Sequence, residues 1–545
     1  MSASSKKKLR NEQQSVQMTE RQLAEQKEAK KVKMYTIAFT AVMVVLLVVA
    51  ITVGVTKAYS NSGTRERSTI ALTVGEHQLN SAELNYFYID AVNNFNNQYG
   101  AYAAMFGLDL SKPLDEQVSN PETGATWADD FLDSAKGNAK AVYALVDAAN
   151  AAGHTLSEED QQHVDAVIDN LELYGQMSGQ GSAKNYIRAL YGPGSSVDSY
   201  RSYVENSILA ESYQHAYSDS LVYEDADLRE AEKENYNKYS AFTFNQYYAA
   251  ASDFVTGGTA DEEGVITYSD EEMAASVKAA EEAANSLLNV TSVEELDKAI
   301  AGLSSNADKE GVASTANVEV PYGSVNTMIV DWLADESRKE GDVTVIANES
   351  TSADAEGKET TTVNGYYVVY YISTNDNTSP LANVRHILVN FEGGTPDANG
   401  QVTYSDEEKA AAKAKAEGLL NEWKAGEATE DSFAALAAEN TQDPGSKDNG
   451  GLYEDVYPGQ MVPSFNDWCF DEARQPGDTG IVESNYGYHV MFYSADSETT
   501  FRDFQIRSEL LQADMDAWYK GLVEAETVTD GDFSLIRTDL VFGAR

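Results

Sequence analysis

The sequence is poor in cysteine and in basic residues. The first shortage excludes disulfides and a lipid anchor, and the second argues against a nucleic-acid partner. Its single cysteine, Cys469, cannot form an intrachain disulfide, and no cysteine near the N-terminus could carry a lipid anchor. Apolar neighbours on both sides of Cys469 favour a buried thiol over a reactive one. Lysine and arginine number 39 against 88 aspartate and glutamate residues, which argues against a nucleic-acid partner because phosphate binding needs a basic surface.

Metal-binding motifs are also lacking. The sequence has no EF-hand loop and no His-Glu-x-x-His element, so we expect no metal site and no cofactor. The acidic excess is explained by solubility and self-repulsion, with cation binding at the acidic surface as the alternative.

One long apolar run lies near the N-terminus. Met34 to Thr56 holds no charged residue, and as a helix of about 34 Å it is long enough to cross a bilayer. Lysines precede it, so the positive-inside rule places residues 1–33 in the cytoplasm and the later chain outside. A cleaved signal peptide is the alternative, although its charged leader would rarely be this long. We therefore expect an uncleaved transmembrane helix over residues 34–56.

The next part of the chain is predicted to be helical. Residues 57–69 are polar and predict a short tether, and a strand at 70–75 leads into a helix capped by Ser81. Helical periodicity then covers residues 127–152, 157–177, 182–191 and 197–222. The many tyrosines here fit helix-packing positions, and a ring-lined groove for non-native polypeptide is the alternative.

The second half contains an internal repeat. Residues 264–272, Gly-Val-Ile-Thr-Tyr-Ser-Asp-Glu-Glu, recur at 400–408 as Gly-Gln-Val-Thr-Tyr-Ser-Asp-Glu-Glu. Residues 331–336, Asp-Trp-Leu-Ala-Asp-Glu, recur at 467–472 as Asp-Trp-Cys-Phe-Asp-Glu. Both matches share an offset of 136 residues, which indicates two structural copies in tandem.

Each copy is predicted to be an α+β fold with a small antiparallel sheet. Its long helix begins at a Ser-Asp-Glu-Glu capping box, with Ser269 and Ser405 as the caps. Its last strand, at 365–371 in the first copy, matches 487–493 in the second. After the second copy, an amphipathic helix is predicted from residue 501 to about 524.

Two of the six histidines lie inside strand-like apolar runs of the second copy. His386 is part of Val-Arg-His-Ile-Leu-Val, and His489 is part of Tyr-Gly-Tyr-His-Val-Met-Phe. A half-polar ring inside a sheet needs a hydrogen-bond partner. If the strands are neighbours, the imidazoles lie side by side, and Asp443 supplies a carboxylate from a Pro-Gly loop. An apolar pocket nearby would contain Leu452, Met461 and Phe465.

As a set, these residues resemble the parvulin family of peptidyl-prolyl cis-trans isomerases. The match runs from Asn383 to Tyr493 and includes Arg-His-Ile-Leu, the Asp-Pro-Gly-Ser-Lys loop, Gly-Gly-Leu, Pro-Ser-Phe and the closing Gly-Tyr-His-Val. One departure is Tyr453, because the family usually continues with glycine and an aromatic residue after Gly-Gly-Leu.

The resemblance implies a catalytic set and a substrate-binding set. The catalytic residues are His386, Asp443 and His489, with Asp443 in a position that the family fills with Cys or Asp. The proline pocket and its rim contain Leu452, Met461, Phe465, Ser484 and Tyr486.

The order of segments also resembles the PrsA- and SurA-type extracytoplasmic foldases, whose partners are unfolded or newly exported polypeptides. It implies a helical chaperone domain at 70–235, a degenerate parvulin-like domain at 236–375 and an isomerase domain at 380–495. Residues 496–545 would contain a C-terminal helix that packs on the chaperone domain.

The first copy tests this assignment within one chain. Its Tyr367 aligns with His489, Thr243 aligns roughly with His386, and it has no Asp-Pro-Gly loop. We expect it to keep the fold without isomerase activity, with activity through other residues as the alternative. For the whole chain we expect an anchored foldase, and the alternatives are a pure holdase with inert parvulin domains and a structural envelope protein.

Overall fold

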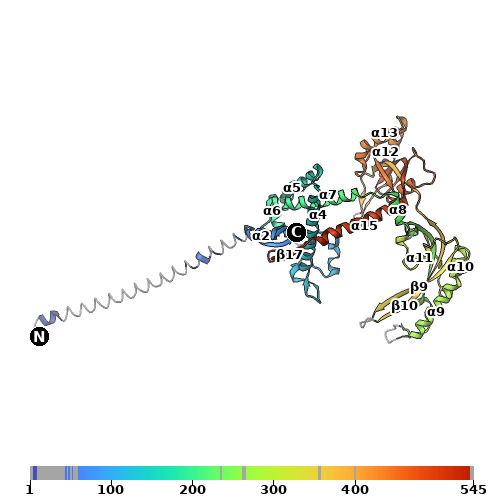
Figure 1. Cartoon of the computed structure of the whole chain (residues 1–545), viewed down its shortest axis with the longest axis horizontal. Coiled ribbons are helices and arrows are strands. Elements are labelled where there is room, and N and C mark those ends of the chain that lie inside the picture. The colour runs from blue at the N-terminus through green and yellow to red at the C-terminus, as the bar shows by residue number, and fades with distance from the viewer. Residues whose placement is uncertain are drawn as a thin grey trace. The chain divides into compact units, whose positions relative to one another are not determined.

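The computed structural model describes residues 4–8, 43, 45, 47–49, 52, 59, 61–233, 236–260, 266–353, 358–397 and 401–539. Most of residues 1–33 and most of the transmembrane helix predicted at 34–56 lie outside these described residues. Within the described ranges, no helix combines the length and apolarity needed to span a membrane. The chain divides into two units, one of residues 1–221 with 514–545 and the other of residues 222–513 (Figure 1).

The first unit is helical and contains a small three-stranded antiparallel sheet. Its helices begin close to the predicted residues because polar side chains cap them, as Ser157 and Ser196 do. The cap of the first long helix is Asn80 rather than the predicted Ser81, since the Asn80 side chain accepts from the N–H groups of Ala82 and Glu83. The elements are α2 (Thr64–Ser68), β1 (Ile70–Val74), β2 (His77–Asn80), α3 (Ser81–Tyr99), η1 (Gly100–Phe106), η2 (Leu114–Glu116), β3 (Val118–Asn120), β4 (Ala125–Thr126), α4 (Trp127–Ala152), α5 (Glu158–Met177), α6 (Ala183–Tyr191) and α7 (Val197–Ser220).

The C-terminal residues complete this first unit. The end of helix α15 (Phe501–Ala525) places Trp518 against Tyr217, with stacked rings 4.0 Å apart, and Leu522 beside the buried Leu145 and Ala210. Strand β17 (Val528–Asp530), which the sequence pattern did not predict, then pairs with β1. The first unit is therefore built from segments that lie far apart in the sequence.

The second unit contains the two copies of the repeat, each with a four-stranded antiparallel sheet. The strand orders are β8-β5-β10-β9 and β14-β11-β16-β15, so corresponding strands occupy corresponding places. This confirms the predicted α+β class with small antiparallel sheets. In Figure 1, the paired strands β9 and β10 of the first copy run on as a long hairpin.

The elements of the first copy are η3 (Tyr236–Tyr239), β5 (Ala241–Ala250), η4 (Ala251–Phe254), β6 (Thr259–Ala260), β7 (Ile266–Thr267), α9 (Asp270–Ser286), α10 (Val293–Ala301), η5 (Ser304–Asn306), β8 (Thr315–Pro321), η6 (Tyr322–Ser324), α11 (Val330–Leu333), β9 (Val343–Ala353) and β10 (Glu359–Asn375). Those of the second copy are β11 (Pro380–Asn390), β12 (Thr395–Pro396), β13 (Val402–Thr403), α12 (Asp406–Ala425), α13 (Glu430–Asn440), η7 (Lys447–Asn449), β14 (Leu452–Val456), α14 (Pro463–Cys469), β15 (Thr479–Glu483) and β16 (Gly487–Thr500). Helix α8 (Asp225–Ala231) precedes both.

Small backbone details are repeated in the two copies. Glu319 and Asp455 stand at equivalent places in β8 and β14, and both have the left-handed conformation that is uncommon outside glycine, with φ of 47° and 52°. Each donates its N–H to a side chain on the neighbouring strand, Thr243 in the first copy and Asn383 in the second. Both predicted capping boxes, at Ser269 and Ser405, are also present. The copies therefore share local geometry as well as topology.

The sheet of the second copy separates two apolar clusters. Alternate residues of a strand point to opposite faces, so Ile387 and Val490 pack beneath α12 and α13. Val384 and Met491, on the same two strands, pack on the other face, against Phe465 and Cys469 of α14. His386 and His489 directly precede Ile387 and Val490, so they also lie on the α14 face.

One buried arginine connects the segments that enter and leave the copies. Arg502, 1% exposed in the first turn of α15, forms an ion pair with Glu232 and donates to the carbonyl of Asp376, 3.2 Å away. Its guanidinium carbon lies 3.8 Å from the ring centre of Tyr236. The side chain thus joins the end of α8, the start of the first copy and the link between the copies.

Candidate active site

The central strands of the second sheet bring the two histidines together. In the antiparallel register of β11 and β16, Leu388 lies opposite His489 and Met491 opposite His386. The imidazoles are therefore diagonal neighbours on one face, with their Nδ1 atoms 3.0 Å apart. Both rings are buried, at 3% and 5% exposure, so each ring nitrogen needs a partner.

A loop after α13 carries Asp443 to the outer nitrogen of His386. Thr441 fixes the loop, because its Oγ1 accepts the N–H of Leu388 on β11. The Oδ2 atom of Asp443 then lies 3.1 Å from Nε2 of His386. The same oxygen accepts the hydroxyls of Ser446 at 2.5 Å and Tyr453 at 2.9 Å. The hydrogen bond from His386 is the largest of the effects that hold the pKa of the Asp443 carboxyl well below its usual range.

The second histidine is held neutral by its surroundings. Burial, and next the neighbouring His386, lower the pKa of His489 to about 4. Near neutral pH this ring is therefore uncharged and serves as a fixed donor and acceptor within the site.

These contacts form a chain of hydrogen bonds through the two histidines. An ionised carboxylate only accepts, so Nε2 of His386 carries the hydrogen that is donated to Asp443. The Nδ1 atoms of His386 and His489 lie 3.0 Å apart, so one of them donates a hydrogen to the other. The Nε2 atom of His489 is hydrogen-bonded to the hydroxyl of Ser484 at 2.8 Å. A continuous chain of hydrogen bonds therefore runs from the rim at Ser484 to Asp443.

Phe465 closes the apolar side of the site. Its ring centre lies 5.3 Å from that of His386 and 5.4 Å from that of His489, edge-on in both cases. Met461 packs against the same cluster. Leu452 is not a member of this cluster, and the register pairs it with Arg385. The predicted rim residue Tyr486 is 63% exposed, and its N–H donates to Ser484.

Sequence reasoning did not assign Ser446 or Tyr453 to the site. Ser446 belongs to the loop motif that drew attention to Asp443, and its hydroxyl is also 3.1 Å from Nε2 of His386. Tyr453 departs from the family pattern, and its position opposite Val384 in the register places it on the histidine face. Burial and the bond to Asp443 raise the pKa of Tyr453 to about 12.

The site favours non-covalent chemistry. The one thiol near it, Cys469, is buried in the apolar cluster, and burial raises its pKa to about 12, so it is a poor nucleophile. Among the described residues, no group of three or more His, Cys, Asp or Glu side chains is placed to hold a metal ion. What remains is an apolar surface beside a fixed set of hydrogen-bonding groups.

The first copy has different residues at the equivalent positions. Its register places Gln246, not Thr243, at the position of His386, because Tyr367 corresponds to His489 and pairs with Tyr248. Thr243 corresponds instead to Asn383, as the shared hydrogen bond to the left-handed residue shows. The ring of Tyr367 lies 4.8 Å from that of Tyr248.

Comparison with known proteins identifies the second copy. Residues 366–494 match the family model of the PPIC-type PPIase domain, that is, of a peptidyl-prolyl cis-trans isomerase domain. The chain is 35% identical to the chaperone SurA of Chromohalobacter salexigens over 147 residues, which are 25% of this chain and 29% of that relative. It is 25% identical to the foldase protein PrsA 1 of Listeria monocytogenes over 42% of this chain and 70% of that relative.

Among solved structures, PrsA from Bacillus cereus is similar at 28% identity and a TM-score of 0.17, over 28% of this chain and 50% of that one. The chain spans less than a third of the SurA relative's length. The resemblance to parvulins and to PrsA- and SurA-type proteins is confirmed by the family model and the sequence relatives.

Proposed function

We propose that this chain, whose residues 366–494 match the family model of the PPIC-type PPIase domain, is an extracytoplasmic foldase. Its second copy would isomerise X-Pro bonds in exported proteins, and its helical unit would bind unfolded chains. The apolar segment 34–56 would anchor it to the membrane with residues 1–33 in the cytoplasm.

The observation that carries this proposal is the ordered chain Ser484–His489–His386–Asp443 beside the apolar surface of Phe465. An X-Pro bond crosses a barrier of about 18–20 kcal/mol when it rotates, and its twisted transition state has lost amide resonance. An apolar surface that holds the proline ring, next to donors that suit the twisted amide, favours that state over the planar one. No covalent intermediate is required.

Within this mechanism the two histidines are fixed groups rather than an acid–base couple. Asp443 would keep the hydrogen on the outer nitrogen of His386, and His386 in turn would orient the neutral His489. Met461 and Phe465 would hold the proline ring. Leu452 and Tyr486 stay predicted members of the binding surface.

The first copy is proposed to keep the fold without the reaction. Gln246 and Tyr367 replace the two histidines, and Tyr367 accepts a hydrogen bond from Asn326 at 3.1 Å. Since the same strands form without the imidazoles, packing alone does not explain why the second copy has them. That contrast favours a function for His386 and His489.

Client binding is assigned to exposed apolar residues of the helical unit. Tyr102, Met105 and Phe106 on η1 are 59%, 82% and 53% exposed, and Phe106 adjoins the aromatic cluster around Phe95. Large exposed apolar side chains of this kind mark interaction surfaces. The proposal expects the full-length chain to suppress aggregation of an unfolded client, and Met105→Ser with Phe106→Ser to weaken this. Met177→Ser, at an apolar side chain that is 76% exposed, is the control and should not.

The catalytic claim is tested by X-Pro isomerisation with the full-length chain. His386→Ala combined with His489→Ala should lower kcat/KM by about 100-fold, because fixed donors at a reaction centre typically contribute this much. The matched first-copy variant, Gln246→Ala with Tyr367→Ala, should keep the rate. A rate unchanged in the histidine variant, or absent in the wild type, would reject the catalytic claim. Aggregation suppression without isomerisation would instead identify a pure holdase.

A further inference from the structure

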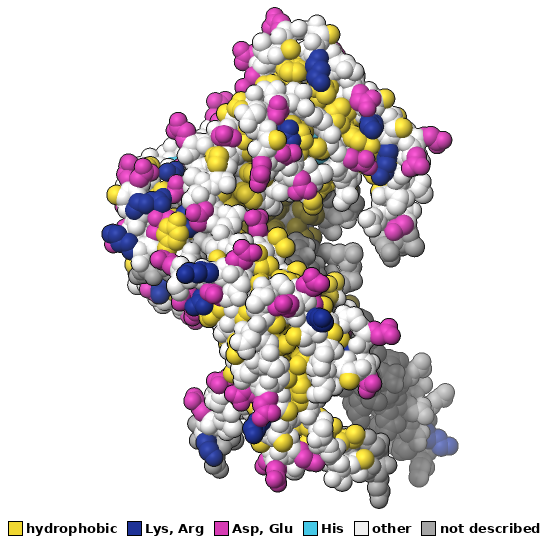
Figure 2. Space-filling view, turned by 90° about the vertical axis from the view of Figure 1, so that its right-hand side faces the viewer, with side chains coloured by type: hydrophobic (Ala, Val, Ile, Leu, Met, Phe, Trp, Pro, Cys, Tyr) yellow, Lys and Arg dark blue, Asp and Glu magenta, His cyan; other side chains and the backbone are white. Residues whose placement is uncertain are grey.

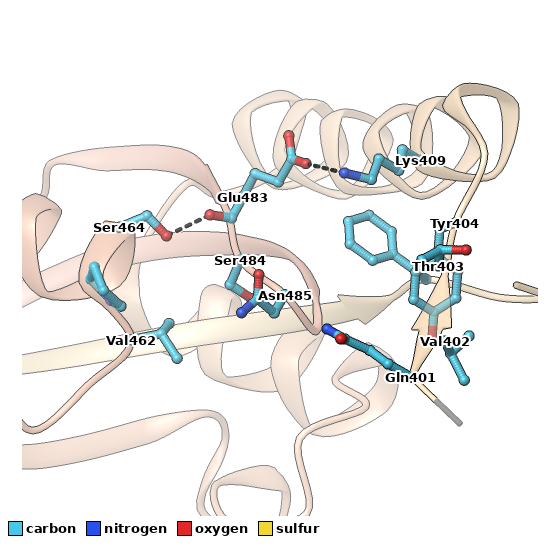
Figure 3. Close-up of a pocket in the computed structure, with 12 residues that line it drawn as sticks. Gln401, Val402, Thr403, Tyr404, Lys409, Val462, Ser464, Glu483, Ser484 and Asn485 are labelled. Carbon is cyan, nitrogen blue, oxygen red and sulfur yellow. Dashed lines mark hydrogen bonds and ion pairs between the residues drawn. The ribbon is translucent and has the colours of Figure 1, made fainter. Parts of the chain in front are cut away.

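A cavity adjoins the candidate active site on the side of α12. Its volume is about 790 Å³, which suits a large side chain or a short stretch of peptide. Figure 3 shows Val402 and Tyr404 on one side of it and Val462 on the other, with Ser484 and Asn485 between them. The cavity is therefore an apolar space with polar groups at its margin.

The cavity is continuous with the catalytic groups. Ser484, which lines it, accepts the N–H of Tyr486 and shares a hydrogen bond with Nε2 of His489. Pro463, on its other side, begins helix α14, which carries Phe465 to the histidines. A polypeptide with its proline against Phe465 therefore has a neighbouring residue within reach of the cavity, since an extended chain advances about 3.3 Å per residue.

The charged residues that line the cavity neutralise each other. They are Lys409 and Glu483, whose Nζ and Oε1 atoms lie 3.2 Å apart, as the dashed line in Figure 3 marks. Tyr488 donates to the other oxygen of Glu483 at 2.8 Å, and Lys409 lies over the ring of Phe391. An acidic client residue in this cavity would meet a lysine whose charge is already balanced.

The first copy lacks this ion pair although it keeps the helix start and the strand. At the repeat offset of 136 residues, Met273 stands in place of Lys409, and Ala347 stands in place of Glu483. The fold therefore does not need the pair. Its presence beside the histidines, and absence where the histidines are absent, indicates a role in selecting substrate.

We propose that this cavity binds the side chain of a residue next to the isomerised proline and selects an uncharged apolar one, with Glu483 balancing the charge of Lys409 so that acidic and phosphorylated residues gain no attraction there. This specificity rests on the proposed isomerase function. Acidic side chains are scattered over the face drawn in Figure 2, as expected from 88 acidic against 39 basic residues.

The test is isomerisation of two peptide series by the full-length chain. One series varies the residue before proline and the other the residue after it, each with Leu, Phe, Glu and Lys. The wild type should prefer Leu and Phe in the series whose varied residue enters the cavity. Glu483→Gln releases the charge of Lys409, so it should raise kcat/KM for the Glu peptide relative to the Leu peptide by about three- to fivefold. Lys409→Met should shift the ratio toward the Lys peptide.

A neutral double variant and a distant control variant test whether charge in the cavity sets the preference. The neutral pair Lys409→Met with Glu483→Gln should keep the wild-type preference for Leu and Phe, because no net charge is exposed. Glu282→Gln, which opens an exposed Lys–Glu pair on α9 of the first copy, should leave all ratios unchanged. Circular dichroism and denaturation midpoints show whether each variant is folded.

The outcomes separate this inference from the function on which it rests. If the wild type isomerises the peptides but neither single variant changes the Glu, Lys and Leu ratios, the inference is wrong and the isomerase function stands. If the wild type accelerates no peptide, the proposed function fails and the inference fails with it. A shift toward the Glu peptide in Glu483→Gln together with a shift toward the Lys peptide in Lys409→Met would support the inference.

Discussion

At the scale of single residues, the buried His489 makes the stability of the second copy depend on pH. Its pKa is about 4 in the folded chain against 6.5 for an ordinary histidine, so the unfolded chain binds more protons between these values. The contribution to stability is complete above pH 6.5 and is lost as the pH falls toward 4. The lowered pKa of Asp443 acts in the same direction at lower pH.

We therefore expect the free energy of unfolding to fall on acidification by about 3 kcal/mol from this histidine. Urea denaturation at a series of pH values measures it. His489→Gln should flatten the profile between neutral pH and 4, whatever its effect on absolute stability. An unchanged slope in this variant would show that another group titrates.

Tyr453 offers a second prediction at this scale. Tyr453→Phe removes one of the donors to the Asp443 carboxylate, so the pKa of Asp443 should rise and the free energy of unfolding should fall by about 1 kcal/mol. NMR titration of the carboxyl group measures the first change. Tyr457→Phe, whose ring stacks on Phe504 away from the carboxylate, is the control and should leave the pKa of Asp443 in place.

The sequence predicted part of the site well, and the limits have physical causes. The alternation of strand side chains placed His386 and His489 on one face, and the Pro-Gly loop indicated Asp443. The sequence did not show that Tyr453 reaches the carboxylate of Asp443, because that contact depends on the register of β14 against β11. Thr243 was misplaced for the same reason, since sequence alignment alone does not fix a strand register.

At the scale of secondary structure, local signals were strong where side chains cap helices. Polar caps and apolar periodicity predicted α4, α5 and α12 closely because both act within a few residues of the chain. Strand β17 has three residues and pairs with β1 from the far end of the sequence, so no local pattern marks it.

The capping box of α12 is expected to support the second copy. Ser405 accepts the N–H of Glu408, whose carboxylate also accepts the N–H of Gly394 and so ties the helix to the loop before it. Ser405→Ala should lower the free energy of unfolding of the second copy by about 1 kcal/mol. Hydrogen exchange resolved by residue measures this, and Ser269→Ala should act on the first copy instead.

At the scale of the molecule, the second unit depends on the buried Arg502. Arg502→Met removes one of the two arginines that pair with the buried carboxylate of Glu232 and leaves Arg229 as the other, so the free energy of unfolding of this unit should fall by about 2 kcal/mol. Adding Glu232→Gln should recover part of the loss, because it removes a buried charge that has lost one of its two ion-pair partners. Arg507→Met on the exposed side of α15 is the control, and chemical denaturation is the measurement.

The pairing of β1 with β17 sets an order of events during synthesis. Leu72 lies opposite Asp530, so the sheet of the first unit cannot close until the ribosome has passed residue 530. Residues 222–513 are by then complete and contain all the partners of their own two sheets. The second copy can therefore fold first, while β1 of the helical unit keeps an unpaired edge until β17 has been made.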